Sequence, residues 1–204
     1  MRRPNMNPLL ALAACAVVGV GGCEPAPVVD PPAAVDEFEA NRASVQYRME
    51  AIDARLAAWD VPDDRTAHEQ FAAEWKEEWD DIEREVRKLK KQLARLTKSF
   101  DRQFARMQRV ARTIDSPQAR AEELSENADL QRRWLATVAE AHSNFKKMDE
   151  QVRAARDFHK TFRLAVMRGR AEAKLAEVRG LSQQVKGTAA ELEKVTTEGR
   201  ALIR

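Results

Sequence analysis

Glycine and proline are sparse in this 204-residue chain, and their absence constrains its fold more than any other feature. No glycine occurs between Cys23 and Gly169, and only Pro62 and Pro117 follow Pro32. Glycine and proline are the residues least compatible with helix interiors, whereas the Ala, Arg, Glu, Lys and Leu that dominate here favour helices. The sequence therefore predicts an all-α protein with few, long helices and no strands.

Apolar residues recur at alternating three- and four-residue steps, which is the spacing of a seam between packed helices. In the seam of the first helix, one slot is filled by Arg42. The apolar seam positions include Phe38 and Met49 in the first helix, Ile82 and Leu93 in the second, and Trp134 and Phe162 in the third. Breaks at 61–64 and 115–117 and a phase change near Gly169 divide the pattern, with Ser116 and Pro117 suited to cap and start a helix. We expect a helical domain over 35–204. Its helices should lie at about 34–60, 65–114, 117–168 and 170–204, the last two either separate or continuous through a bend.

Charge along the chain indicates how these helices are connected. Residues 69–83 are mostly acidic and residues 84–112 mostly basic, and the next helix begins acidic and continues basic. An antiparallel turn at Ser116 would bring unlike charges together at both ends of the hairpin, and such pairs select register more than they stabilise. The predicted fold is an elongated antiparallel helical hairpin or coiled-coil bundle of three to four long helices.

The start of the chain has the character of a targeting segment. Arg2 and Arg3 precede an apolar stretch that leads through two glycines into Cys23, and residues 24–35 are proline-rich. A basic start, a short apolar stretch and a small-residue exit are typical of a secretory signal. The apolar stretch at 9–20 would span only about 18 Å as a helix, too short to cross a hydrocarbon core of roughly 30 Å. We expect a signal peptide at 1–22 and a tether at 23–34.

This arrangement resembles the signal of bacterial lipoproteins, in which the cysteine is acylated and becomes the first residue of the mature protein. The resemblance implies that Cys23 carries the lipid, including palmitate, and is the membrane contact. Cys15 is a competing site, because its preceding residues match the lipoprotein pattern better, but it would leave too short an apolar region. The remaining alternative is an ordinary signal peptide cut near Cys23, leaving a free thiol.

The same resemblance bears on location. It implies a protein that faces the periplasm, and Glu24 stands where an aspartate would resemble an inner-membrane retention signal. The outer membrane is therefore favoured in a cell that has one. The chain has 35 basic and 33 acidic residues, so removal of Arg2 and Arg3 with the signal peptide leaves 33 of each. This neutral balance gives no bias toward nucleic acid.

Groups for catalysis or metal binding are not arranged in any recognisable pattern. The three histidines, His68, His142 and His159, show no metal-ligand spacing, and the region after Cys23 has no glycine-rich phosphate loop. We expect no enzymatic activity, no cofactor and no metal.

Two surfaces are candidates for recognition. The first is a basic stripe that could grip phosphates or pair with the acidic start of the next helix. The second is an aromatic pair, Trp75 and Trp79, at core spacing but also of a residue type enriched in binding hot spots. The basic stripe consists of Lys91, Arg95, Lys98, Arg102, Arg106 and Arg109.

Met148-Asp149, Arg156-Asp157 and the helix ending at 201–203 resemble the C-terminal half of an uncharacterised family of small bacterial lipoproteins with a helical domain of unknown function. The likeness covers residues 130–203, and the chain departs from the family pattern at Glu150 and at 163–165. It implies a helical coiled-coil fold and an envelope location, but no activity. We therefore expect a lipid-anchored structural or adaptor protein with an envelope partner or self-association. The alternative is a module binding an anionic glycolipid or wall polymer through the basic stripe.

Overall fold

The structure, a computed structural model, describes residues 30–58, 65–171 and 174–203, and it is all-α over these ranges. The helices are α1 (Pro31–Ala58), α2 (Arg65–Ala111), α3 (Pro117–Met167), α4 (Leu175–Glu191) and α5 (Glu193–Ile203). The predicted signal peptide, Cys15 and Cys23 lie outside the described residues.

The N-terminal boundary of α1 lies earlier than predicted. Pro31 opens the helix rather than Ala34, so the last four residues of the predicted tether are helical. Proline is well suited to a first helical turn, because its fixed φ matches the helix and its missing N–H has no intrahelical partner there.

The connection between α2 and α3 is a tight turn. α2 ends at Ala111, three residues before the predicted end, and the backbone N–H of Ile114 bonds to the Ala111 carbonyl at 3.2 Å. Ser116 caps α3 as predicted, since its side-chain oxygen accepts a hydrogen bond from the Ala119 N–H at 3.4 Å, and Pro117 follows at the first helical position.

The C-terminal region contains two interruptions. α3 ends at Met167, and Gly169 adopts φ +66°, a left-handed conformation that glycine accepts most easily, so the chain does not continue as one helix through this point. The second interruption, at Leu192, separates α4 from α5 and was not predicted.

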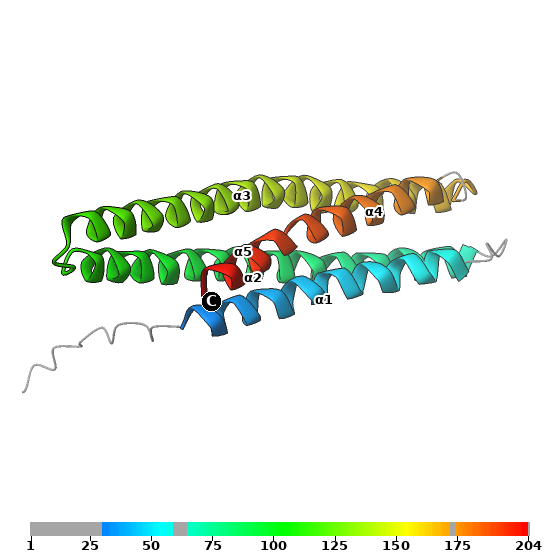
Figure 1. The fold of residues 1–204 in the computed structure, drawn as a ribbon. Coiled ribbons are helices and arrows are strands. Elements are labelled where there is room, and N and C mark those ends of the chain that lie inside the picture. Colours follow the sequence, from blue (N-terminus) through cyan, green and yellow to red (C-terminus); the bar gives the residue numbers. More distant parts are fainter. Residues whose placement is uncertain (1–29, 59–64, 172–173, 204) are drawn as a thin grey trace, which may run out of the picture.

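The helices form one bundle in which α2 and α3 are the long central hairpin (Figure 1). α1 packs beside α2, while α4 and α5 lie along α1 and α3, on the side of the bundle away from α2. The predicted seam positions form a continuous buried core, which includes Phe38, Ile82, Leu93, Trp134 and Phe162. The seam slot at Arg42 is also buried.

The hairpin is longer than the elements that cover it. Figure 1 shows α2 and α3 continuing past the start of α1 and the end of α5, so the tip of the hairpin has only two helices. We call residues 104–130 the overhang, and the remainder the four-helix body. The side chains of Met107, Leu124 and Leu130 in the overhang are only partly buried, and Val110 is 60% exposed.

Candidate functional site: the outward face of α2

The basic stripe lies on the face of α2 that points away from the core. Its six residues are all exposed, whereas the residues that alternate with them, including Leu93, Leu96 and Phe100, are fully buried. Steps of three and four residues keep the bases on one side of a helix with 3.6 residues per turn. The stripe therefore presents a row of cations about 27 Å long.

The bases of the stripe have no acidic partner among the described residues. The ion pairs of the described ranges include none of the six, and Arg109 Nε instead donates to the Ala105 carbonyl of its own helix at 3.3 Å. The expectation that the stripe pairs with the acidic start of α3 is therefore wrong. Those acids are Glu122, Glu123, Glu126 and Asp129.

The register of the hairpin explains this result. Glu83 pairs with Arg156, Lys90 with Asp149 at 2.5 Å, and Gln108 with Gln131, which together fix one antiparallel alignment of α2 and α3. At that alignment the acids at 122–129 lie opposite the last turn of α2 and the loop, beyond most of the stripe. Most of the stripe also faces away from α3, although Arg102 and Arg106 line a groove to which Glu123 and Asn127 of α3 contribute.

The acidic run near the start of α2 behaves differently. It pairs mainly with α1, where Arg48 contacts Asp81 at 2.9 Å and Arg55 contacts Glu78 at 2.9 Å. Of the α3 bases expected to face it, only Arg156 forms such a pair. The others are Lys146, Lys147 and Arg153.

Trp75 and Trp79 belong to the core and present no recognition surface. They are 3% and 2% exposed, and Trp75 packs edge-to-face on Phe158 with ring centroids 5.4 Å apart. Phe71 and Phe162 extend the same cluster. Aromatic side chains at this spacing are held by the opposite helix rather than offered to a partner.

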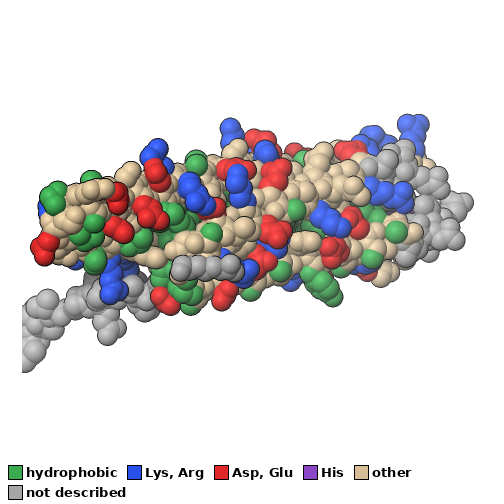
Figure 2. All heavy atoms as spheres, in the orientation of Figure 1, with side chains coloured by type: hydrophobic (Ala, Val, Ile, Leu, Met, Phe, Trp, Pro, Cys, Tyr) green, Lys and Arg blue, Asp and Glu red, His purple; other side chains and the backbone are tan. Residues whose placement is uncertain are grey.

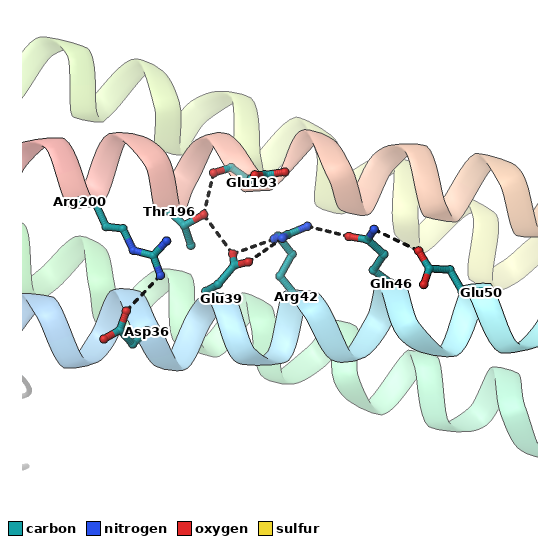
Figure 3. A network of polar contacts seen from close by, with 8 residues as sticks. All are labelled: Asp36, Glu39, Arg42, Gln46, Glu50, Glu193, Thr196 and Arg200. Carbon is teal, nitrogen blue, oxygen red and sulfur yellow. Dashed lines mark hydrogen bonds and ion pairs between the residues drawn. The ribbon is translucent and has the colours of Figure 1, made fainter.

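A polar network inside the bundle was not anticipated, although the sequence marked Arg42 as a seam residue (Figure 3). Arg42 forms a two-point contact with Glu39, with Nε–Oε2 at 2.8 Å and Nη2–Oε1 at 2.6 Å. The Thr196 hydroxyl of α5 donates to Glu39 at 3.1 Å, close to the interruption at Leu192. The network therefore joins α1 to α5 through charged groups.

The electrostatics of this network favour its charged form. The hydrogen bond from Arg42 lowers the pKa of Glu39 below its ordinary value, although partial burial acts in the opposite direction. The same bond raises the pKa of Arg42. The pair lies within α1, and the Thr196 hydroxyl connects it to α5. Both directions of pKa shift keep the pair ionised near neutral pH.

A groove of about 900 Å³ lies at the step between the four-helix body and the overhang. Met107, Val110 and Ile114 give it an apolar wall, and Arg102 and Arg106 of the stripe line it as well. Asp30, Glu123, Asn127 and Ile203 are also among its lining residues. Figure 2 shows hydrophobic side chains gathered at this end of the molecule among charged ones.

His159 occupies a smaller groove of about 430 Å³ between α2 and α3, near Lys76 and Arg163. Partial burial lowers the pKa of His159, and the positive charges of Arg163 and Lys76 lower it further. Within residues 30–58, 65–171 and 174–203, no group of three or more His, Cys, Asp or Glu is placed to hold a metal ion.

None of the helices described in the structure is both long and apolar enough to cross a membrane. Comparison with known proteins adds no relative, since no family model matches the chain and neither a curated protein nor a solved structure matches it. The resemblance to uncharacterised lipoproteins therefore remains a prediction.

Proposed function

We propose that this chain is a lipid-anchored cell-envelope protein, held to the membrane through acylated Cys23 and facing the periplasm, with a structural or adaptor role. The observation that carries the adaptor role is the way in which ion pairs join neighbouring helices along the bundle. They select the register of neighbouring helices, and the charged outer surface of the bundle is what a partner would meet. Examples are Arg48–Asp81 between α1 and α2, Lys90–Asp149 between α2 and α3, Lys147–Glu191 between α3 and α4, and Arg200–Asp36 between α1 and α5.

Metabolic labelling with an acyl-chain analogue tests the anchor. The wild-type protein should be labelled, Cys23→Ala should lose the label, and Cys15→Ala should keep it. The reverse pattern would move the anchor to Cys15, and an unlabelled wild type would refute lipidation.

Site-directed crosslinking tests the adaptor role. A photoreactive group at Tyr47, which is 72% exposed on α1, should give a discrete adduct with one envelope protein or with a second copy of this chain. The same photoreactive group at Leu135 on α3, which is 48% exposed, tests whether the adduct forms on one surface of the bundle only. Identical mixtures of abundant envelope proteins from both positions would contradict a specific adaptor surface.

The second candidate function is binding of an anionic envelope ligand, a glycolipid or a wall polymer, through the basic stripe. The six cations favour it, because no acid of the described residues pairs with them and such a base can pair with an external anion. Reversing charge at Lys98, Arg102 and Arg106 should abolish binding of such a ligand while leaving the helical circular dichroism unchanged. Equal loss of helix would assign the stripe a structural role.

A further inference from the structure

The bases of α2 from residue 84 onward divide into two groups with different surroundings. Those from 84 to 90 are all paired: Arg84 with Asp81, Arg87 with Glu83, Lys88 with Glu85 and Lys90 with Asp149. The six that follow, from Lys91 to Arg109, are exposed and pair with no acid of the described residues. Asp101 is the only acid between 91 and 109, and it lies among six bases. The change from paired to unpaired occurs within one helical turn.

The second half of α2, which carries the stripe, also lies beside the start of α1, the described end of the chain that is nearest to Cys23 in sequence. Asp30, the first described residue, lines the same groove as Arg102 and Arg106. Seven residues, 23–29, separate it from the start of the mature chain predicted above. Seven residues span at most about 25 Å when fully extended. An acyl chain on Cys23 would therefore place the bilayer surface within that distance of the stripe.

We propose that the outward face of α2 docks on the anionic phospholipid surface of the membrane that holds the anchor, so that the bundle lies along the bilayer instead of projecting from it. This inference rests on the proposed anchoring at Cys23. The stripe is a row of cations about 27 Å long that can contact lipid phosphates together. A basic patch combined with an acyl chain is a recognised way to make membrane attachment durable.

The end of the stripe supplies an apolar contact as well. Val110 is 60% exposed and follows Arg109 directly, and Met107 lies on the same groove wall. The acids of the groove, Asp30 and Glu123, stand beside this wall, whereas the outward side of the helix is basic. In the docked orientation α4, which packs on α1 and α3, faces away from the membrane and remains accessible to a partner.

Vesicle cosedimentation tests the proposal with the full chain carrying Cys15→Ala and Cys23→Ala, which has no site for acylation. Binding is compared between vesicles of phosphatidylcholine alone and vesicles of equal parts phosphatidylcholine and phosphatidylglycerol. The N-terminal apolar stretch is present in every variant, so the readout is the preference for anionic over neutral vesicles. We expect a clear anionic preference that weakens as salt is raised, because salt screens exposed charges.

Arg102→Gln with Arg106→Gln in that background should reduce the anionic preference about thirtyfold, since each base near an anionic surface contributes a factor of about five. The matched control, Lys146→Gln with Arg153→Gln, removes two exposed α3 bases that form no ion pair with described residues and should change the preference less than about threefold. Val110→Ser should weaken binding several-fold. Because Val110 is 60% exposed, we expect this change to have little effect on stability.

The proposal is overturned if neutral and anionic vesicles bind equally, or if the control pair loses as much as the stripe pair. It is also overturned if the stripe variants abolish self-association or binding to a soluble wall polymer while vesicle binding is unchanged. Acyl labelling of the wild type is scored separately. Unlabelled protein with intact anionic preference would refute the anchor and leave the docking face standing, and labelled protein without that preference would do the opposite.

Discussion

The four-helix body and the overhang at the tip of its hairpin differ in how much apolar surface they bury. In the body, α2 and α3 are covered by α1, α4 and α5, and side chains such as Phe158 and Leu93 are almost completely buried. In the overhang only the first turn of α1 and the end of α5 approach the same hairpin, through Pro31, Pro32 and Ile203, and Met107 and Ile114 are only partly buried. Apolar burial therefore stabilises the body, whereas the overhang depends more on its turn, its helix cap and the continuity of its helices.

The largest test of this contrast is a matched pair of core truncations. Phe158→Ala in the body removes a ring that packs on Trp75 and Phe162 with centroids 5.4 Å away from each, and it should cost about 3–5 kcal/mol of unfolding free energy. Met107→Ala in the overhang should cost about 1 kcal/mol, because its side chain is already partly in water. Urea unfolding measures both, and equal losses would remove the distinction between the two regions.

The next test concerns the polar network of Arg42, Glu39 and Thr196 inside the body. Arg42→Met leaves the Glu39 carboxylate without its two-point partner, and we expect a loss of about 3 kcal/mol, the lower end for a broken buried pair since the Glu39 side chain is 25% exposed. Arg42→Met combined with Glu39→Met should recover most of that loss, because apolar side chains often replace a buried ion pair without penalty. A double variant as unstable as the single one would show that the network stabilises the fold by more than neutralising the Glu39 carboxylate.

The same network predicts that folding stability depends on pH. The pKa of Glu39 is lower in the folded protein than its ordinary value, so its contribution to stability is complete above the ordinary value and is lost as the pH falls through the folded one. Wild-type protein should therefore lose stability in acid more steeply than Glu39→Gln. Urea midpoints across an acid titration measure this difference, and parallel curves would contradict it.

Much of the body could be predicted from the sequence, because helical periodicity depends on the residues of one helix at a time. The seam pattern placed Phe38, Met49 and Trp134 in the core, and Ser116 was correctly assigned as a cap. The Glu39–Thr196 contact could not be predicted, since it joins residues 157 positions apart. The pairing predicted for the stripe failed for a related reason, because it requires the hairpin register, which the composition of each helix does not contain.

Glycine substitutions probe how closely α5 approaches its neighbours in the body. A Cβ added at Gly199 would lie 2.9 Å from Val35 Cγ2, and the stiff valine side chain can yield little, so Gly199→Ala should destabilise by about 1 kcal/mol. A Cβ added at Gly187 in α4 would have no neighbouring atom within 4 Å. Gly187→Ala should therefore stabilise the protein by about 0.5–1 kcal/mol through helix propensity. Thermal midpoints should therefore move in opposite directions, and shifts of the same sign would mean that the contact at Gly199 relaxes freely.

The smallest expected effect on stability belongs to the stripe, and it separates a surface kept for recognition from one kept for folding. The six bases form no ion pair with the described residues, and six like charges on one helix face repel one another. Neutralising Lys98, Arg102 and Arg106 to Gln should therefore change the unfolding free energy by no more than about 0.5 kcal/mol, with any change toward greater stability at low salt. Urea unfolding at low and high salt measures this. A loss above about 1 kcal/mol would mean that the bases stabilise the helix through contacts with other parts of the chain. An unchanged or increased stability would leave the cluster of like charges without a folding role, as the proposed docking on an anionic surface requires.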